Sequence, residues 1–148
     1  MSDIRNEIEK RILVLDGAMG TMLQRYNFTE EDYRGERFKD YPSSLKGNND
    51  LLSLTQPKAI SEVHKKYFEA GADIVETNTF SGTTIAMADY RMEELAYELN
   101  VAGAQAAKRA ASRAEAEDGK RRFVAGAVGP TRRPVVVELF TSQGCSSC

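Results

Sequence analysis

Three short segments of the sequence carry residue types suited to binding a small polar ligand. They are Asp16-Gly17-Ala18-Met19-Gly20, Glu76-Thr77-Asn78-Thr79 and Gly129-Pro130-Thr131. A carboxylate such as Asp16 accepts hydrogen bonds from an ammonium group, and glycines let backbone N–H groups approach a bound anion closely. Together, these groups could hold both ends of an amino acid.

Asn78 adds an amide that both donates and accepts hydrogen bonds within one site. A purely structural interpretation competes with this one. Asp16-Gly17 is a common turn pair, and Asp16 or Thr21 could cap the short helix expected over residues 22–25. From residue types and spacing alone, both interpretations of Asp16 stay open.

Two further groups are weaker candidates for chemistry. Asp73 and Glu76 are three residues apart in an expected strand, so their side chains point to opposite faces and cannot act as an acid–base pair. We expect Asp73 to be a solvated residue at the start of the strand. His64 is the only histidine and has no Cys or His at ligand spacing, so we expect it to pack or to lie at the surface.

Cys145 and Cys148 form a C-x-x-C motif, which is typical of redox pairs and zinc sites. In redox proteins a helix after the first cysteine stabilises its thiolate, and the sequence stops at Cys148. A structural zinc site needs four ligands, which two chains would have to pool. We therefore expect no catalytic or metal site at these cysteines. A thiol redox or metal module that works through Cys145 and Cys148 stays as an alternative function of the chain.

The elements that would position these segments alternate between strand and helix. Apolar runs predict strands over 12–15, 72–77 and 123–128. Helical spacing predicts a helix over 57–70 and another from about 84 to about 117, broken near Asp89 to Arg91. This βαβαβ order predicts a parallel sheet, whose ligands bind at the carboxyl ends of the strands.

Two other stretches depart from this alternation. Residues 26–56 carry many aromatic side chains without a clear period, so we expect an ordered excursion packed on the main body. Residues 134–140 predict another strand. It follows the third strand too closely for a parallel crossover, so it does not extend the pattern.

Composition excludes several classes of protein. The chain has 148 residues and a formal net charge of −2, which argues against nucleic-acid binding through a basic surface. No long uncharged apolar run predicts a membrane span, and no apolar stretch near Met1 predicts a signal peptide. We expect a cytoplasmic protein without a disulfide framework.

Six runs of sequence carry a resemblance to a known family. They cover residues 12–22 (ILVLDGAMGTM), 34–38 (RGERF), 45–52 (LKGNNDLL), 67–80 (YFEAGADIVETNTF), 83–90 (TTIAMADY) and 124–131 (VAGAVGPT). These runs resemble the N-terminal homocysteine-binding domain of cobalamin-dependent methionine synthases, which are homocysteine S-methyltransferases. The resemblance extends over residues 11–131.

The resemblance implies a fold and a function. The fold would be the N-terminal part, about three βα units, of a (β/α)₈ TIM barrel, which takes roughly 250 residues in full. Homocysteine would be the substrate, bound by Asp16 and by the backbone of Gly17 and Ala18, with Asn78 nearby. The family's cofactors are zinc, which binds the substrate thiolate, and cobalamin, which supplies the methyl group in methionine biosynthesis.

The sequence also departs from the family. The family's zinc ligands are three cysteines on later strands, and Cys145 and Cys148 do not replace them. We therefore expect this chain alone to bind neither zinc nor cobalamin tightly and to be inactive. Residues 134–148 resemble the start of a thioredoxin-like protein, which predicts a fusion or truncation junction between residues 1–131 and 132–148. Unpaired outer strands predict self-association, and a non-catalytic βαβ interaction unit is a further alternative.

Overall fold

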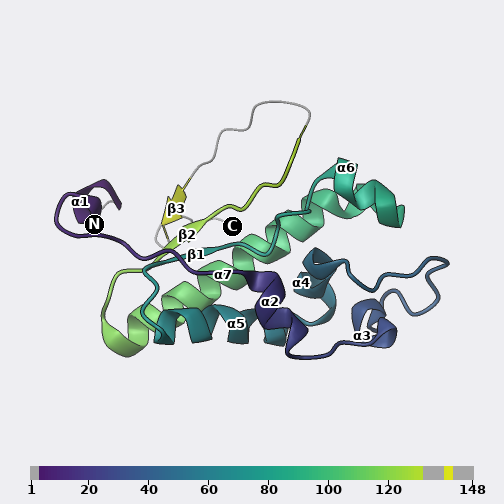
Figure 1. Ribbon diagram of the computed structural model, residues 1–148, viewed down its shortest axis with the longest axis horizontal. Coiled ribbons are helices and arrows are strands. Elements are labelled where there is room, and N and C mark those ends of the chain that lie inside the picture. The colour runs from purple at the N-terminus through teal and green to yellow at the C-terminus, as the bar shows by residue number, and fades with distance from the viewer. Residues whose placement is uncertain (1–3, 132–138, 142–148) are drawn as a thin grey trace.

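The computed structural model describes residues 4–131 and 139–141, which form a small open sheet packed on helices (Figure 1). Strands β1 (Ile74–Glu76) and β2 (Phe123–Ala125) pair in parallel, with Val75 opposite Val124. Helices α5 (Pro57–Glu69) and α7 (Ala96–Asp118) lie side by side beneath them. The predicted α/β class is confirmed, and strand and helix alternate as expected from α5 to β2. The described residues form no closed barrel, so the barrel remains an expectation drawn from the family.

The two long helices begin and end where local sequence signals place them. Pro57 occupies the first turn of α5, where its missing N–H costs nothing, and Gly71 follows the helix with a φ of 104°. Gly119, with a φ of 70°, ends α7 in the left-handed region. The predicted break near Asp89 to Arg91 is confirmed, because Arg91 adopts a φ of 57°.

This break separates α7 from a short preceding helix. Helix α6 (Thr84–Met87) is capped by the Thr83 hydroxyl and continues into two 3₁₀ turns, η2 (Ala88–Tyr90) and η3 (Glu93–Leu95). The apolar face of α7 then carries mostly small side chains. Its buried residues are Ala96, Leu99, Gly103, Ala106, Ala107, Ala110 and Ala111.

Small side chains on α7 allow a close approach to the loop that follows β1. A Cβ added to Gly103 would lie 2.5 Å from Cγ2 of Thr79, closer than real contacts permit. A larger residue at this position would push the helix away from Asn78 and Thr79. Gly103 therefore helps to set the position of the loop at the carboxyl end of β1.

Residues 26–56 form the ordered excursion that their aromatic content predicts. It contains α3 (Glu30–Arg34), the 3₁₀ turn η1 (Asn49–Leu51) and α4 (Leu52–Thr55). The rings of Tyr26 and Phe28 stack with centroids 5.2 Å apart, and the Arg34 guanidinium donates to the carbonyl of Ser43 at 2.9 Å. These contacts hold the irregular backbone against the helices.

The first predicted strand is the main error in the expected fold. The chain leaves helix α1 (Ile4–Ile8), and residues 12–15 make only one parallel bridge, between Leu15 and Ile74. Ile12 is 89% exposed and Val14 is 53% exposed, so the run is not buried on both faces. Within the described residues, no element packs over it to bury these side chains.

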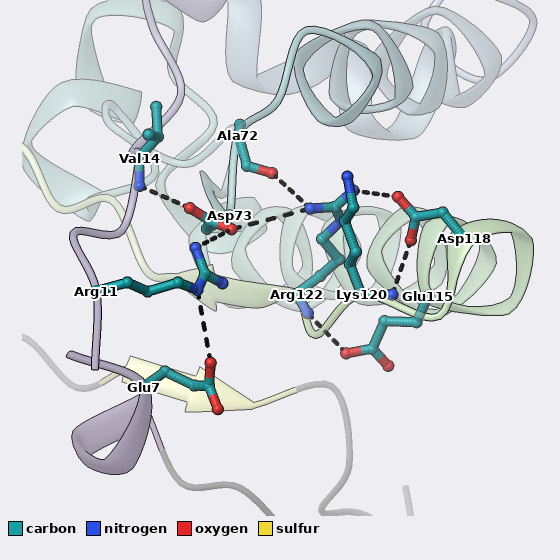
Figure 2. Close-up of polar contacts among 9 residues, drawn as sticks. All are labelled: Glu7, Arg11, Val14, Ala72, Asp73, Glu115, Asp118, Lys120 and Arg122. Atoms are coloured by element: carbon teal, nitrogen blue, oxygen red, sulfur yellow. Dashed lines mark hydrogen bonds and ion pairs between the residues drawn. The ribbon is translucent and has the colours of Figure 1, made fainter. Parts of the chain in front are cut away.

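Asp73 corrects a second expectation, because it is buried and not solvated. It is 6% exposed and lies in a polar network at the start of β1 (Figure 2). Arg11 Nη1 donates to Oδ1 at 2.9 Å, and the Val14 N–H donates to Oδ2 at 2.9 Å. Arg122 lies 4.0 Å from the same carboxylate. The positive charges of Arg11 and Arg122, from two distant segments, offset the cost of removing the Asp73 carboxylate from water.

The strand expected over 134–140 lies mostly outside the described residues. Its end falls in β3 (Leu139–Thr141), which pairs antiparallel with β2, so that residue 139 lies opposite Ala125. This direction agrees with the expectation that the tail does not extend the parallel pattern.

Candidate functional site

A cleft of about 690 Å³ lies at the carboxyl ends of the strands. It joins two of the three segments singled out from the sequence, together with the turn around Asn49. The third segment contributes instead through Gly129, whose N–H donates to the Phe80 carbonyl at 2.8 Å. The lining residues are Asp16, Gly17, Ala18, Met19, Gly20, Gly47, Asn48, Asn49, Asp50, Glu76, Thr77, Asn78, Phe80, Ser81, Tyr90, Ala125, Gly126, Ala127 and Val128.

Asp16 is fixed to the end of β1 by its backbone and by its side chain. Its N–H donates to the Ile74 carbonyl at 2.9 Å, and both carboxyl oxygens lie 3.1 Å from the Glu76 nitrogen, whose N–H donates to them. Burial raises the pKa of Asp16 to about 7; the Glu76 N–H opposes this shift, and the nearby Glu76 charge adds to it. Asp16 therefore titrates near neutral pH.

The structural alternative for Asp16 is wrong in one respect. Helix α2 (Met19–Gln24) has Ala18 as its N-cap and no side-chain cap. Neither Asp16 nor Thr21 therefore caps this helix. The Asp16 carboxyl group is held at β1 instead and lines the cleft.

Tyr67 supports the glycine loop, and the sequence analysis missed it because it lies within the helix expected over residues 57–70. Its hydroxyl donates to the Ala18 carbonyl at 3.1 Å. A Cβ added to Gly17 would lie 3.1 Å from the same hydroxyl oxygen, so the loop passes close to the ring. Spacing along one helix gives no signal for such a contact with a loop 49 residues away.

Asn78 lines the cleft, and its amide also holds two segments together. Its Nδ2 donates to the Asn49 carbonyl at 2.9 Å and to the Ser53 hydroxyl at 3.1 Å. Thr79 donates to the Ala127 carbonyl at 2.8 Å, which joins the ends of β1 and β2. The loop after β1 is thus fixed on both sides of the cleft.

Asp50 is a second cleft carboxylate that sequence reasoning missed. It is 4% exposed, and burial raises its pKa to about 6, while the Ser81 N–H donates to it and opposes the shift. In the sequence, Asp50 lies in the run 45–52 that resembles the family, and its polar neighbours predict a turn without marking a carboxylate site.

His64 lies outside the cleft, and the prediction of a packing role is confirmed. It is fully buried, and neither ring nitrogen has a hydrogen-bond partner in the part of the chain that the structure describes. Burial lowers the pKa of His64 to about 4, so the ring is neutral at physiological pH.

The donor sets of the described residues do not fit zinc. Residues 4–131 and 139–141 contain no cluster of three or more His, Cys, Asp or Glu side chains able to hold a metal ion. Cys145 and Cys148 lie outside these residues, so a redox or metal role for them stays a prediction. Over the same ranges, no helix is long and apolar enough to cross a membrane.

Comparison with known proteins identifies a family match over most of the chain. The sequence profile of the homocysteine S-methyltransferases matches residues 13–142, a range that contains every residue of the cleft. It ends beyond residue 131, where we expected the family pattern to stop.

Solved structures give a similar result. The oxidized form of the homocysteine methyltransferase MmuM from Escherichia coli shares 27% identity over 86% of this chain, with a TM-score of 0.68. The metallated form of the same enzyme shares 26% identity over 86%, with a TM-score of 0.66. The chain spans only 40% and 41% of the length of these two structures.

Proposed function

This chain belongs to the homocysteine S-methyltransferase family, and we propose that its cleft binds homocysteine. One observation carries the proposal. Asp16, a carboxylate fixed by the Glu76 N–H, stands beside the backbone of Gly17 and Ala18 in one cleft at the carboxyl end of β1. Ligands of parallel α/β folds bind at this edge.

Each group has a role that matches one end of an amino acid. The Asp16 carboxylate accepts hydrogen bonds from the amino group of homocysteine. The backbone N–H groups of Gly17 and Ala18 donate to the carboxylate of homocysteine. The side-chain oxygen of Asn78 adds a further hydrogen-bond acceptor. Because Asn78 also bonds to the Asn49 carbonyl, it keeps the walls of the cleft in place as well.

The finer assignment is to the cobalamin-dependent methionine synthases, supported by the six runs of sequence that resemble them. We propose that the described residues are the N-terminal part of a TIM barrel whose complete form transfers a methyl group from methylcobalamin to homocysteine. That reaction belongs to methionine biosynthesis in the cytoplasm. The described residues do not fit zinc, and we propose that this chain alone binds homocysteine without methylating it.

Isothermal titration calorimetry with L-homocysteine tests this function. We expect the 148-residue chain to bind homocysteine, and Asp16→Asn to weaken binding about tenfold or more, because a charged hydrogen-bond partner is lost. Asp40→Asn is the matched control, since Asp40 is an exposed carboxylate outside the cleft. Equal affinity in Asp16→Asn would contradict the site, and tight zinc-dependent binding would contradict the proposed inactivity.

Exposed apolar side chains favour a second candidate, a non-catalytic unit that associates with itself. Ile12, Val14 and Leu15 are 89%, 53% and 50% exposed and lie beside β1 along a run with a single bridge. Such an edge can pair with another chain. Sedimentation velocity should show oligomers that Ile12→Lys reduces, whereas a single monomer peak at all concentrations would rule this candidate out.

A further inference from the structure

Asp50 stands out among the residues of the cleft because its carboxyl group is buried but only partly hydrogen-bonded. It belongs to η1 and is 4% exposed. The Ser81 N–H donates to the carboxyl group, whereas Oδ2 has no partner within the described ranges 4–131 and 139–141. An unpaired oxygen of a buried carboxylate is costly unless a donor reaches it.

The turn that carries Asp50 is held rigidly. The Asn48 side chain accepts from the Leu51 N–H at 3.4 Å and so caps η1. The Tyr33 hydroxyl donates to the Asn49 side-chain oxygen at 2.7 Å, and Asn78 donates to the Asn49 carbonyl at 2.9 Å. Because these contacts hold both sides of the turn, Asp50 cannot easily leave the cleft to find a partner.

The charge of the lining indicates which ligand could supply the missing donor. Three carboxylates line the cleft, from Asp16, Asp50 and Glu76, and among the described residues of its lining there is no Lys, Arg or His. Both oxygens of Asp16 already accept from the Glu76 N–H. At Asp50, one oxygen has no protein partner within the described chain, so a cationic donor would give it its first hydrogen bond.

We infer that Oδ2 of Asp50 accepts a hydrogen bond from the ammonium group of the bound amino acid, so that Asp50 selects ligands that carry a protonated amine. This inference rests on the proposed homocysteine site and adds a specificity-determining residue to it. An ammonium group has three N–H donors, so Asp16 and Asp50 can both serve it. Desolvation inside the cleft strengthens this charged bond relative to one in water.

The test compares two ligands that differ only in the amine. L-Homocysteine and 4-sulfanylbutanoate are titrated calorimetrically into the wild-type chain, Asp50→Asn and the exposed control Asp40→Asn. We expect Asp50→Asn to weaken homocysteine binding about ten- to a hundredfold and to leave 4-sulfanylbutanoate binding unchanged. Equal homocysteine affinity in Asp50→Asn and wild type, or an equal loss for both ligands, would overturn the inference.

Stability separates a binding role from a structural one. Removing an ionised, incompletely paired carboxylate should leave the thermal midpoint of Asp50→Asn at pH 8 equal to or above that of wild type. A midpoint lower by several degrees would mean that Asp50 holds the fold together, and would overturn the inference.

A charge-only probe keeps the inference testable if homocysteine does not bind. The ¹³Cγ resonance of Asp50 is followed by NMR while butylammonium or butanoate is added to the wild-type chain. A saturable shift with butylammonium alone supports Asp50 as an ammonium acceptor even where the proposed substrate fails. No shift with butylammonium overturns the inference, while homocysteine binding is judged separately by calorimetry.

Discussion

The two ends of strand β1 place carboxylates in opposite electrostatic surroundings. At the start, Asp73 is paired with Arg11, accepts the Val14 N–H and lies close to Arg122 (Figure 2). At the end, Asp16 and Asp50 line a cleft in which residues 4–131 and 139–141 place no basic side chain. Burial raises the pKa of both cleft carboxyls, to about 7 and about 6.

This difference separates residues that stabilise the fold from residues available to a ligand. Arg122 donates to the Ala72 carbonyl at 3.2 Å and to Asp118 at 2.6 Å, so the network at the start of β1 ties it to the end of α7. The described side chains that line the cleft include no such basic partner for its carboxylates. In parallel α/β folds, stability is commonly served at the amino ends of strands and chemistry at the carboxyl ends.

The largest expected effect follows from removing the charge of Asp73. Asp73→Asn leaves Arg122, which is 3% exposed, without part of its compensation. We expect the free energy of unfolding to fall by about 3–5 kcal/mol in urea denaturation. If that variant does not fold, Arg11→Met, at the more exposed end of the pair, should cost about 1 kcal/mol. A loss of less than about 1 kcal/mol in each variant that folds would mean that the carboxylate at the start of β1 does not stabilise the fold more than those in the cleft.

His64 is buried, lies at neither end of the strand and has no hydrogen-bond partner within the described residues. Its folded pKa of about 4 lies below the ordinary value of 6.5, so the unfolded chain takes up the proton first as the pH falls. Stability is fully present above pH 6.5, and about 3 kcal/mol should be lost as the pH falls through 4. His64→Leu should abolish this loss; an unchanged pH dependence in urea denaturation would contradict it.

Asp16 should show the opposite pH dependence. Its folded pKa of about 7 exceeds the ordinary value of 3.8, so the folded chain keeps its proton longer and loses stability as the pH rises from about 4 to 7. Asp16→Asn should therefore be more stable than wild type at pH 8, by about 1 kcal/mol because solvent screens a partly exposed group. Thermal melts at pH 4 and pH 8 measure it; a variant less stable at pH 8 would mean that the site is a structural pair.

The smallest expected effect comes from an exposed ion pair on α5. Lys65 Nζ lies 3.6 Å from Oε1 of Glu69, and their side chains are 58% and 60% exposed. Glu69→Gln should change the free energy of unfolding by less than about 0.5 kcal/mol. A larger loss would show that pairing alone, without burial, explains the importance of Asp73.

Local signals in the sequence were sufficient for the two long helices and for the position of the cleft. Pro57, Gly71 and Gly119 act on the backbone within a few residues, so the ends of α5 and α7 were predictable. The order of strands and helices placed Asp16 and Asn78 at one edge of the sheet, where the cleft lies.

Contacts between distant segments account for what the sequence did not predict. Asp73 looks like a solvated strand-start residue until Arg11, 62 residues away, is brought beside it. Asp50 likewise becomes a cleft residue only through a turn held by Tyr33 and Asn78. The prediction of a strand over 12–15 was wrong for a related reason. A strand is buried only if neighbouring elements cover it, and the residue types of the run do not show whether such neighbours exist.

The network at Asp73 also bears on how fast the chain folds and unfolds. It joins segments 50 to 62 residues apart, so the chain must lose loop-closure entropy before any of its bonds can form. We expect these bonds to form after the rate-limiting barrier. In stopped-flow measurements, Arg11→Met should then unfold faster than wild type and refold at nearly the same rate. The Arg11–Asp73 contact would thus slow unfolding without speeding folding.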